Sequence, residues 1–208
     1  MSAPSEVFPG ISRGDRIVIR ITGAVFAVGA LLFLVVGAMA VIRRLIDPTS
    51  LPVGLLADIP LDPASVPGIE ILRSSGDHVL ITASGLSAGA IAALAIGNGL
   101  GALTASVVCG ALAYFAWRVT RGQPFHRSLV GVSLATGITI LFGALLSTFI
   151  GGFGQMQAAA ELNPAFDDQL IVGFEFDPLP WLVGFGVMAL AVVFQAGTRL
   201  QRDTEGLV

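Results

Sequence analysis

Long runs without charged side chains constrain this chain more than any other feature. Residues 21–42, between Arg20 and Arg43, are 22 consecutive uncharged positions. As a helix they would span about 33 Å, close to the hydrocarbon thickness of a bilayer. Similar runs follow later in the chain, and only 12% of all residues are charged against 54% hydrophobic. We therefore expect an all-α membrane protein, a bundle of four transmembrane helices.

The later runs exceed one crossing and must be divided at turn signals. The stretch after His78 begins with β-branched residues, so its helix is expected to start near Leu86. The glycines at 151–154 predict the end of the third helix. The prediction is a single membrane domain, residues 1–208, with spans at roughly 18–42, 97–117, 128–150 and 179–198 and outer loops at 43–85 and 151–178.

The first apolar run has a second interpretation, a cleaved signal peptide, because Ala-Met-Ala at 38–40 resembles a cleavage site. The apolar part of a signal peptide is usually about 7–15 residues, shorter than this run. A retained transmembrane span is therefore the expectation.

Charge distribution predicts the orientation. The N-terminal tail, the 118–127 loop and the C-terminal tail together hold eight arginines and four acidic residues. The two outer loops hold three arginines against ten acidic residues. By the positive-inside rule, both termini and the 118–127 loop are predicted to be cytoplasmic. We call this side the arginine-rich end, and the side of the two outer loops the acidic end.

The outer loops contain strand-like sequence. Residues Ile69–Ala83 form two β-rich runs around Ser-Ser-Gly-Asp and predict a hairpin. In the second outer loop Leu170, Val172, Phe174 and Phe176 alternate with other residues, which predicts a third strand. Three strands with an apolar face can be stable where a lone hairpin is marginal. We expect a small extracytoplasmic β-cap made by both loops; irregular loops are the alternative.

The predicted spans contain few residues that could support catalysis or transport. Their uncharged cores contain no Asp, Glu, Lys, Arg or His, which argues against an ion-coupled transporter. No His-Glu-x-x-His motif and no acid–histidine pair lies in a span, so no enzyme activity, cofactor or metal is expected. Cys109 is the only cysteine, which excludes an intramolecular disulfide. The amides of Asn98 and Gln195 are expected to bond neighbouring helices rather than line a polar path.

Small residues recur at four-residue spacing in the second and third helices. Such faces allow helices to approach closely. We expect them to pack these two helices within one chain, with a homodimer contact as the alternative. The residues are Gly97, Gly101 and Ala105 in the second helix and Gly143, Ser147 and Gly151 in the third.

The basic segment between the second and third helices is expected to be a tight connection. Gly122 suits a helix C-cap and Pro124 suits the first turn of the next helix. Arginines at this level would lie among lipid headgroups, which attract them. They are too few for a nucleic-acid site, and the lone His126 is not expected to bind metal.

This segment and the C-terminus resemble an uncharacterised family of bacterial four-helix membrane proteins. The likeness covers the second helix to the C-terminus, in "RGQPFHRSLVGV" and "FQAGTRLQRDTEGLV". The turn of the family corresponds to Pro124, Phe125 and Leu129, and its helical ending to Leu200, Gln201, Asp203, Glu205, Leu207 and Val208. Members are often encoded beside a small helix-turn-helix regulator. The resemblance thus implies a multi-pass protein of the bacterial inner membrane, with a cytoplasmic DNA-binding protein as its partner.

These observations lead to one functional prediction and two alternatives. We predict a membrane protein without enzymatic activity that binds lipid and a partner protein but no nucleic acid directly. The partner would contact the 118–128 turn and the tail, which the i, i+4 pair Arg199 and Asp203 allows to continue as a helix. The alternatives are an acidic β-cap that binds an extracytoplasmic ligand or envelope protein, and a homo-oligomeric channel or exporter. The predicted partner contacts are Arg121, Gln123, Pro124, Phe125, Arg127, Leu200, Gln201, Asp203, Glu205, Leu207 and Val208.

Overall fold

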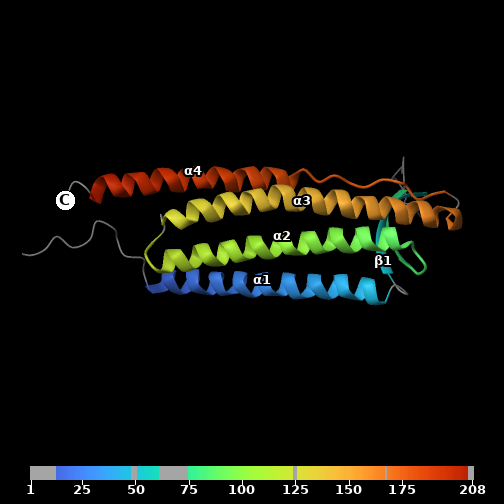
Figure 1. The fold of residues 1–208 in the computed structure, drawn as a ribbon, viewed down its shortest axis with the longest axis horizontal. Helices are drawn as coiled ribbons and strands as arrows, with labels where there is room; N and C mark the ends of the chain where they lie inside the picture. The colour runs from blue at the N-terminus through green and yellow to red at the C-terminus, as the bar shows by residue number, and fades with distance from the viewer. Residues whose placement is uncertain (1–12, 48–50, 61–74, 124–125, 167, 206–208) are drawn as a thin grey trace, which may run out of the picture. The chain divides into compact units, whose positions relative to one another are not determined.

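Four long helices dominate the computed structural model, which describes residues 13–47, 51–60, 75–123, 126–166 and 168–205 (Figure 1). They are α1 (Arg13–Ile46), α2 (Ala88–Thr120), α3 (Arg127–Leu162) and α4 (Leu179–Glu205). Two antiparallel strands, β1 (Leu51–Pro60) and β2 (Ser75–Ala83), and a 3₁₀ turn at Asn163–Ala165 complete the described elements. Each helix contains a stretch long and apolar enough to cross a membrane. The predicted fold class, a four-helix membrane bundle with a small sheet, is confirmed.

Three of the helices are longer than a bilayer requires. α1, α2 and α3 have 34, 33 and 36 residues. At 1.5 Å per residue each is about 50 Å long, against about 30 Å of hydrocarbon. Each therefore has room for a segment outside the hydrocarbon.

The predicted end of the third helix at residues 151–154 is wrong, because α3 continues to Leu162. Glycine weakens an exposed helix, but here the glycines provide room for close neighbours. A side chain at Gly152 would overlap the Phe174 ring, and one at Gly154 would lie 2.7 Å from the Leu94 backbone nitrogen. Packing overrides the local preference for a turn.

The chain divides into two compact units. We call the first, Met1–Leu34, Thr104–Leu141 and Trp181–Val208, the arginine-rich unit. The second, which we call the capped unit, comprises Val35–Leu103 and Phe142–Pro180 and contains both strands.

Small side chains bring the helices of the arginine-rich unit together. A Cβ added at Gly23 of α1 would lie 3.0 Å from the Ala116 Cβ of α2. Ser106 donates a hydrogen bond from its hydroxyl to the Ala30 carbonyl at 2.8 Å. Between α3 and α4, a Cβ at Gly184 would lie 2.8 Å from the Leu141 side chain. These contacts are of the kind that hold helices together in lipid.

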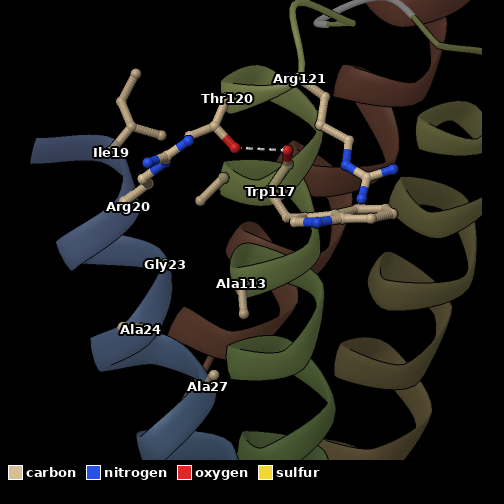
Figure 2. Close-up of a pocket in the computed structure, with 10 residues that line it drawn as sticks. Ile19, Arg20, Gly23, Ala24, Ala27, Ala113, Trp117, Thr120 and Arg121 are labelled. Atoms are coloured by element: carbon tan, nitrogen blue, oxygen red, sulfur yellow. Dashed lines mark hydrogen bonds between the residues drawn. The ribbon is translucent and has the colours of Figure 1, made fainter. Parts of the chain in front are cut away.

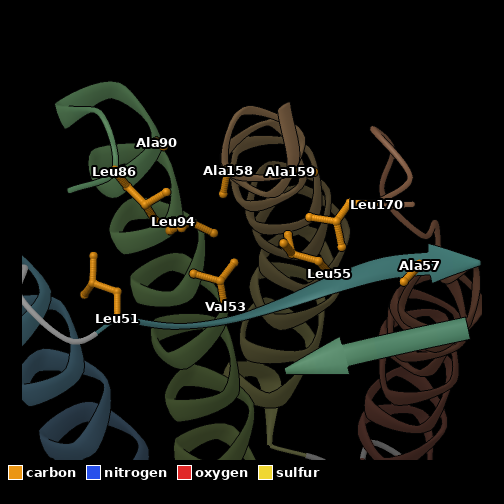
Figure 3. Packing of buried hydrophobic residues seen from close by; sticks show 10 residues of the cluster. All are labelled: Leu51, Val53, Leu55, Ala57, Leu86, Ala90, Leu94, Ala158, Ala159 and Leu170. Carbon is orange, nitrogen blue, oxygen red and sulfur yellow. The ribbon is translucent and has the colours of Figure 1, made fainter. Parts of the chain in front are cut away.

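The capped unit is built around the inner face of β1. Leu51, Val53, Leu55 and Ala57 alternate along the strand, and each is at most 3% exposed. They pack on side chains at the ends of α2 and α3 and in the segment after α3 (Figure 3). Those partners are Leu86, Ala90, Leu94, Ala158, Ala159 and Leu170.

The predicted hairpin within Ile69–Ala83 is wrong, since β2 pairs with β1, from Leu51↔Ala83 to Pro60↔Ser75. Residues 69–74 lie outside the described part. The sequence did not predict β1 because the segment contains proline and glycine, which are rare in strands. Its side chains nevertheless alternate between buried and exposed, as they do in a strand. Pro52 is tolerated because a two-stranded sheet has only edge strands.

The predicted third strand is reduced to one bridge, Ala57↔Leu170. The Ile171 N–H donates to the Leu56 carbonyl at 2.9 Å, but the Gly173 N–H then bonds Ile171 O at 2.9 Å and turns the chain. Phe174 instead packs on the Phe149 ring, with centroids 5.6 Å apart. Both outer loops still meet in one cap, as expected.

Candidate functional site

The turn between α2 and α3 is closed by a helix cap. Gly122 has φ +71° and its N–H donates to Val119 O at 3.0 Å. The Gln123 N–H donates to Arg118 O at 3.1 Å. These two bonds form a Schellman motif, which needs a left-handed residue at the position that glycine fills. The predicted C-cap at Gly122 is confirmed.

A chain of polar side chains joins the end of α2 to the start of α3. Arg118 Nε donates to the Tyr114 hydroxyl at 2.8 Å, which is 2.9 Å from Ser128 Oγ. Ser128 Oγ lies 2.7 Å from His126 Nδ1, and this nitrogen also accepts the Ser128 N–H at 3.1 Å. Because Nδ1 is an acceptor, the hydroxyls can donate in one direction, from tyrosine to serine to histidine. His126 thus orders the start of α3.

Aromatic rings hold the arginines at this end of the molecule. The Arg121 guanidinium lies over the Trp117 ring, 4.1 Å from its centroid. Arg118 lies 5.1 Å from the centroids of both Tyr114 and Trp117, and its Nη1 donates to Gln123 Oε1 at 2.9 Å. Cation–π contacts restrain an arginine and leave its outer edge available. The sequence prediction did not include Tyr114, Trp117 or Ser128, although rings beside arginines at a span end are typical of membrane interfaces.

The predicted partner contacts fall into three groups. Arg121, Gln123 and Arg127 are exposed at the turn or in the first residue of α3. Pro124, Phe125, Leu207 and Val208 lie outside the described residues. Leu200, Gln201, Asp203 and Glu205 belong to the last turns of α4, where only the backbone is described. The continuation of α4 to Glu205 agrees with the helical tail expected from the sequence.

The small-residue faces lie between α2 and α3 within the capped unit. A Cβ at Gly97 would lie 2.6 Å from the Gly151 nitrogen, and one at Gly101 would lie 3.0 Å from Ser147 Oγ. The Ser147 hydroxyl donates to Gly97 O at 2.8 Å. In this chain these four residues serve an intramolecular contact. Ala105 and Gly143 are half-buried in the same two helices.

The expected bond of Asn98 to a neighbouring helix is confirmed, with Arg44 of α1 as a partner that the sequence did not predict. The Asn98 amide oxygen, turned toward α1, accepts from Arg44 Nη1 and Nη2 at 2.7 and 2.9 Å. Arg44 Nη2 also lies 3.5 Å from the Pro52 carbonyl of β1. The sequence feature that could have indicated this contact is the presence of an arginine at the acidic end. Gln195, the other amide considered, is exposed on α4.

The outer surface carries isolated charges. Glu161 accepts the Ser87 N–H at 2.8 Å at the start of α2, and His78 lies 3.6 Å from Glu175 with both side chains exposed. Among the described residues, no three His, Cys, Asp or Glu side chains are grouped as metal ligands would be. The thiol of Cys109 is half-buried and 3.6 Å from where a Cβ on Gly29 would lie.

No protein family, curated protein or solved structure matches this chain. No family is therefore identified for it. The structure establishes a multi-pass integral membrane protein with four candidate spans.

Proposed function

We propose that this protein is a non-enzymatic membrane protein that binds a cytoplasmic protein through the turn between α2 and α3. The observation that carries the proposal is the exposed and basic character of the described residues of this turn, Arg121, Gln123 and Arg127. A Schellman cap ends α2 at Gly122, and the Arg118–Tyr114–Ser128–His126 chain joins the end of α2 to the start of α3, while Arg121 and Gln123 remain exposed. A side chain that is already held in place, as Arg121 is over the Trp117 ring, loses little entropy on binding, which favours affinity.

Charge defines the partner's contact surface. The arginines of the turn form no ion pair with any residue that the structure describes, and the pair of His78 with Glu175 lies at the acidic end. These arginines are therefore available to an acidic surface. A DNA-binding regulator uses its basic face to bind DNA, so it would contact these arginines with its opposite face. A regulator bound in this way would be held at the membrane, away from its operator. This is the partner class implied by the likeness of the turn and tail to the bacterial four-helix proteins.

The test is purification from the native host in mild detergent, with mass spectrometry of co-purifying proteins and titration of the purified candidate. Phe125→Ala, Arg121→Gln and truncation after Gln201 should each weaken binding while the protein still inserts. Arg43→Gln removes one exposed arginine in the last turn of α1 and is the matched control. Unchanged affinity in all three variants would refute docking at the turn.

A second candidate function is supported by the outer face of the sheet. Leu80 of β2 is 77% exposed and lies opposite Gly54, where an added Cβ would meet no atom within 4 Å. An exposed leucine on an open sheet edge suits an added strand or an apolar partner segment. We propose, as the alternative, that the cap binds an envelope protein. Leu80→Glu should then abolish its capture, while Phe125→Ala should have no effect.

A further inference from the structure

A cavity in the arginine-rich unit lies between α1 and α2. Its volume is about 480 Å³, and its walls include Gly23, Ala24 and Ala27 of α1 and Ala113 of α2. Ala24 and Ala27 are exposed, so the cavity is open along the side of the helix pair. Since both helices are candidate membrane spans, an occupant with an apolar part would meet lipid-like walls.

Polar and basic side chains also line the cavity. Arg20, Thr120 and Arg121 line it together with Trp117 (Figure 2). In Figure 2 the Arg20 side chain extends toward Thr120, whose hydroxyl donates to Trp117 O at 2.8 Å. Arg121 is held over the Trp117 ring, whereas Arg20 is exposed and makes no ion pair within the described chain. The cavity thus joins an available cation to an apolar groove.

Arg20 also stands at a defined level of its helix. It is the last charged residue before the 22 uncharged positions of α1. A basic residue there, beside a tryptophan, is placed at the height of lipid headgroups. The guanidinium forms strong paired hydrogen bonds with phosphate oxygens.

We propose that this cavity binds one anionic phospholipid, with its phosphate at Arg20 and an acyl chain along the groove formed by Ala24 and Ala27. Charge complementarity and the apolar walls together select an amphiphile of this kind. A soluble anion would use only the cation, and a zwitterionic lipid carries no net negative charge. The phosphate position at Arg20 belongs to α1 and not to the turn between α2 and α3.

The experiment measures contact between lipid and Trp117. Trp181→Phe leaves Trp117 as the only tryptophan. This full-length protein is placed in phosphatidylcholine nanodiscs that contain a minor fraction of brominated phosphatidylglycerol or, for comparison, the same fraction of brominated phosphatidylcholine. Bromine quenches a nearby indole, so the brominated phosphatidylglycerol should quench Trp117 more strongly.

Two variants and one control locate the site. Arg20→Gln should reduce the preference for phosphatidylglycerol about fivefold, the usual effect of one basic residue near anionic lipid. Ala24→Leu keeps every charge but fills the groove, and should abolish the excess quenching. Arg127→Gln removes an exposed arginine of α3 that does not line the cavity, and should leave the preference unchanged.

Three outcomes would overturn the proposal. Equal quenching by the two brominated lipids would show no selective site. An equal loss of the preference for phosphatidylglycerol in Arg20→Gln and Arg127→Gln would indicate that the basic surface as a whole attracts the anionic lipid. Loss of the excess quenching on addition of inorganic phosphate would assign the cation to a free anion instead of a lipid.

Discussion

Both units of this protein have small-residue contacts between helices, and the capped unit adds a cluster of large apolar side chains. In the capped unit, Leu51, Val53 and Leu55 of β1 are at most 3% exposed and form a cluster with α2 and α3. In the arginine-rich unit, contacts such as that of Gly23 with Ala116 are made by small residues. This difference indicates that the cluster at β1 formed in water, whereas the contacts between the helices formed in lipid.

Water drives large apolar side chains into a common cluster, but lipid does not, because its tails are as apolar as leucine. Helices in lipid therefore associate through close backbone approach and a few hydrogen bonds. A two-stranded sheet also has free edges, and these cannot lie in hydrocarbon. We infer that the cap of β1 and β2 is outside the bilayer, as its place in an outer loop predicts.

The largest expected effect is the loss of a buried leucine from the cap. Leu55 is 2% exposed, and Leu55→Ala should lower the free energy of unfolding of the capped unit by about 2–5 kcal/mol. Leu80→Ala in the same sheet should change it by less than about 0.5 kcal/mol, because Leu80 is 77% exposed. Thermal unfolding in detergent and the rate of proteolysis of the outer loops measure the two values. Equal losses would contradict a water-excluding cluster at β1.

The next effect concerns backbone approach between helices. Gly97→Ala places a methyl group against the Gly151 backbone and should destabilise the α2–α3 contact by about 1–3 kcal/mol. Gly110→Ala on the same helix meets no atom within 4 Å, so it should be neutral or stabilise the helix. Unfolding in mixed micelles of increasing SDS content measures both. If Gly110→Ala were the more harmful change, close α2–α3 packing would be excluded.

A smaller effect is expected at the polar contact between Arg44 and Asn98. Arg44→Gln should remove the paired hydrogen bonds and destabilise the outer end of α1 by about 1 kcal/mol. Arg43→Gln is the control, since Arg43 is the exposed neighbour. A double-mutant cycle with Asn98→Ala isolates the pair. A coupling energy of zero would mean that the two side chains act independently.

The smallest effect is expected in the turn between α2 and α3. Tyr114→Phe removes the hydroxyl that joins Arg118 to Ser128 and should weaken the turn by about 0.5–1 kcal/mol. Hydrogen exchange of the amides at 121–129 should accelerate about threefold. Thr139→Ala removes a hydroxyl bonded only within α3 and should not change these amides. Unaltered exchange in Tyr114→Phe would show that the Schellman cap alone orders the turn.

The amino-acid sequence by itself determined the membrane class, the four spans and the Gly122 cap. These features depend on local properties, the length of uncharged runs and the backbone freedom of glycine. The uneven distribution of arginine was equally visible and supports the predicted orientation. Gly97, Gly101, Ser147 and Gly151 were recognised from their spacing alone as residues for close helix approach.

Only the tertiary structure decided which segment pairs with β2 and where α3 ends. Pro52 and Gly54 hid β1, because its stability comes from burial against α2 and α3 and not from local strand preference. Gly152 and Gly154 stay helical because Phe174 and Leu94 occupy the space beside them. The contacts of Arg44 with Asn98 and of Tyr114 with Ser128 join residues 54 and 14 positions apart in the chain. Such contacts cannot be predicted from local sequence, because they form only when separate helices pack together.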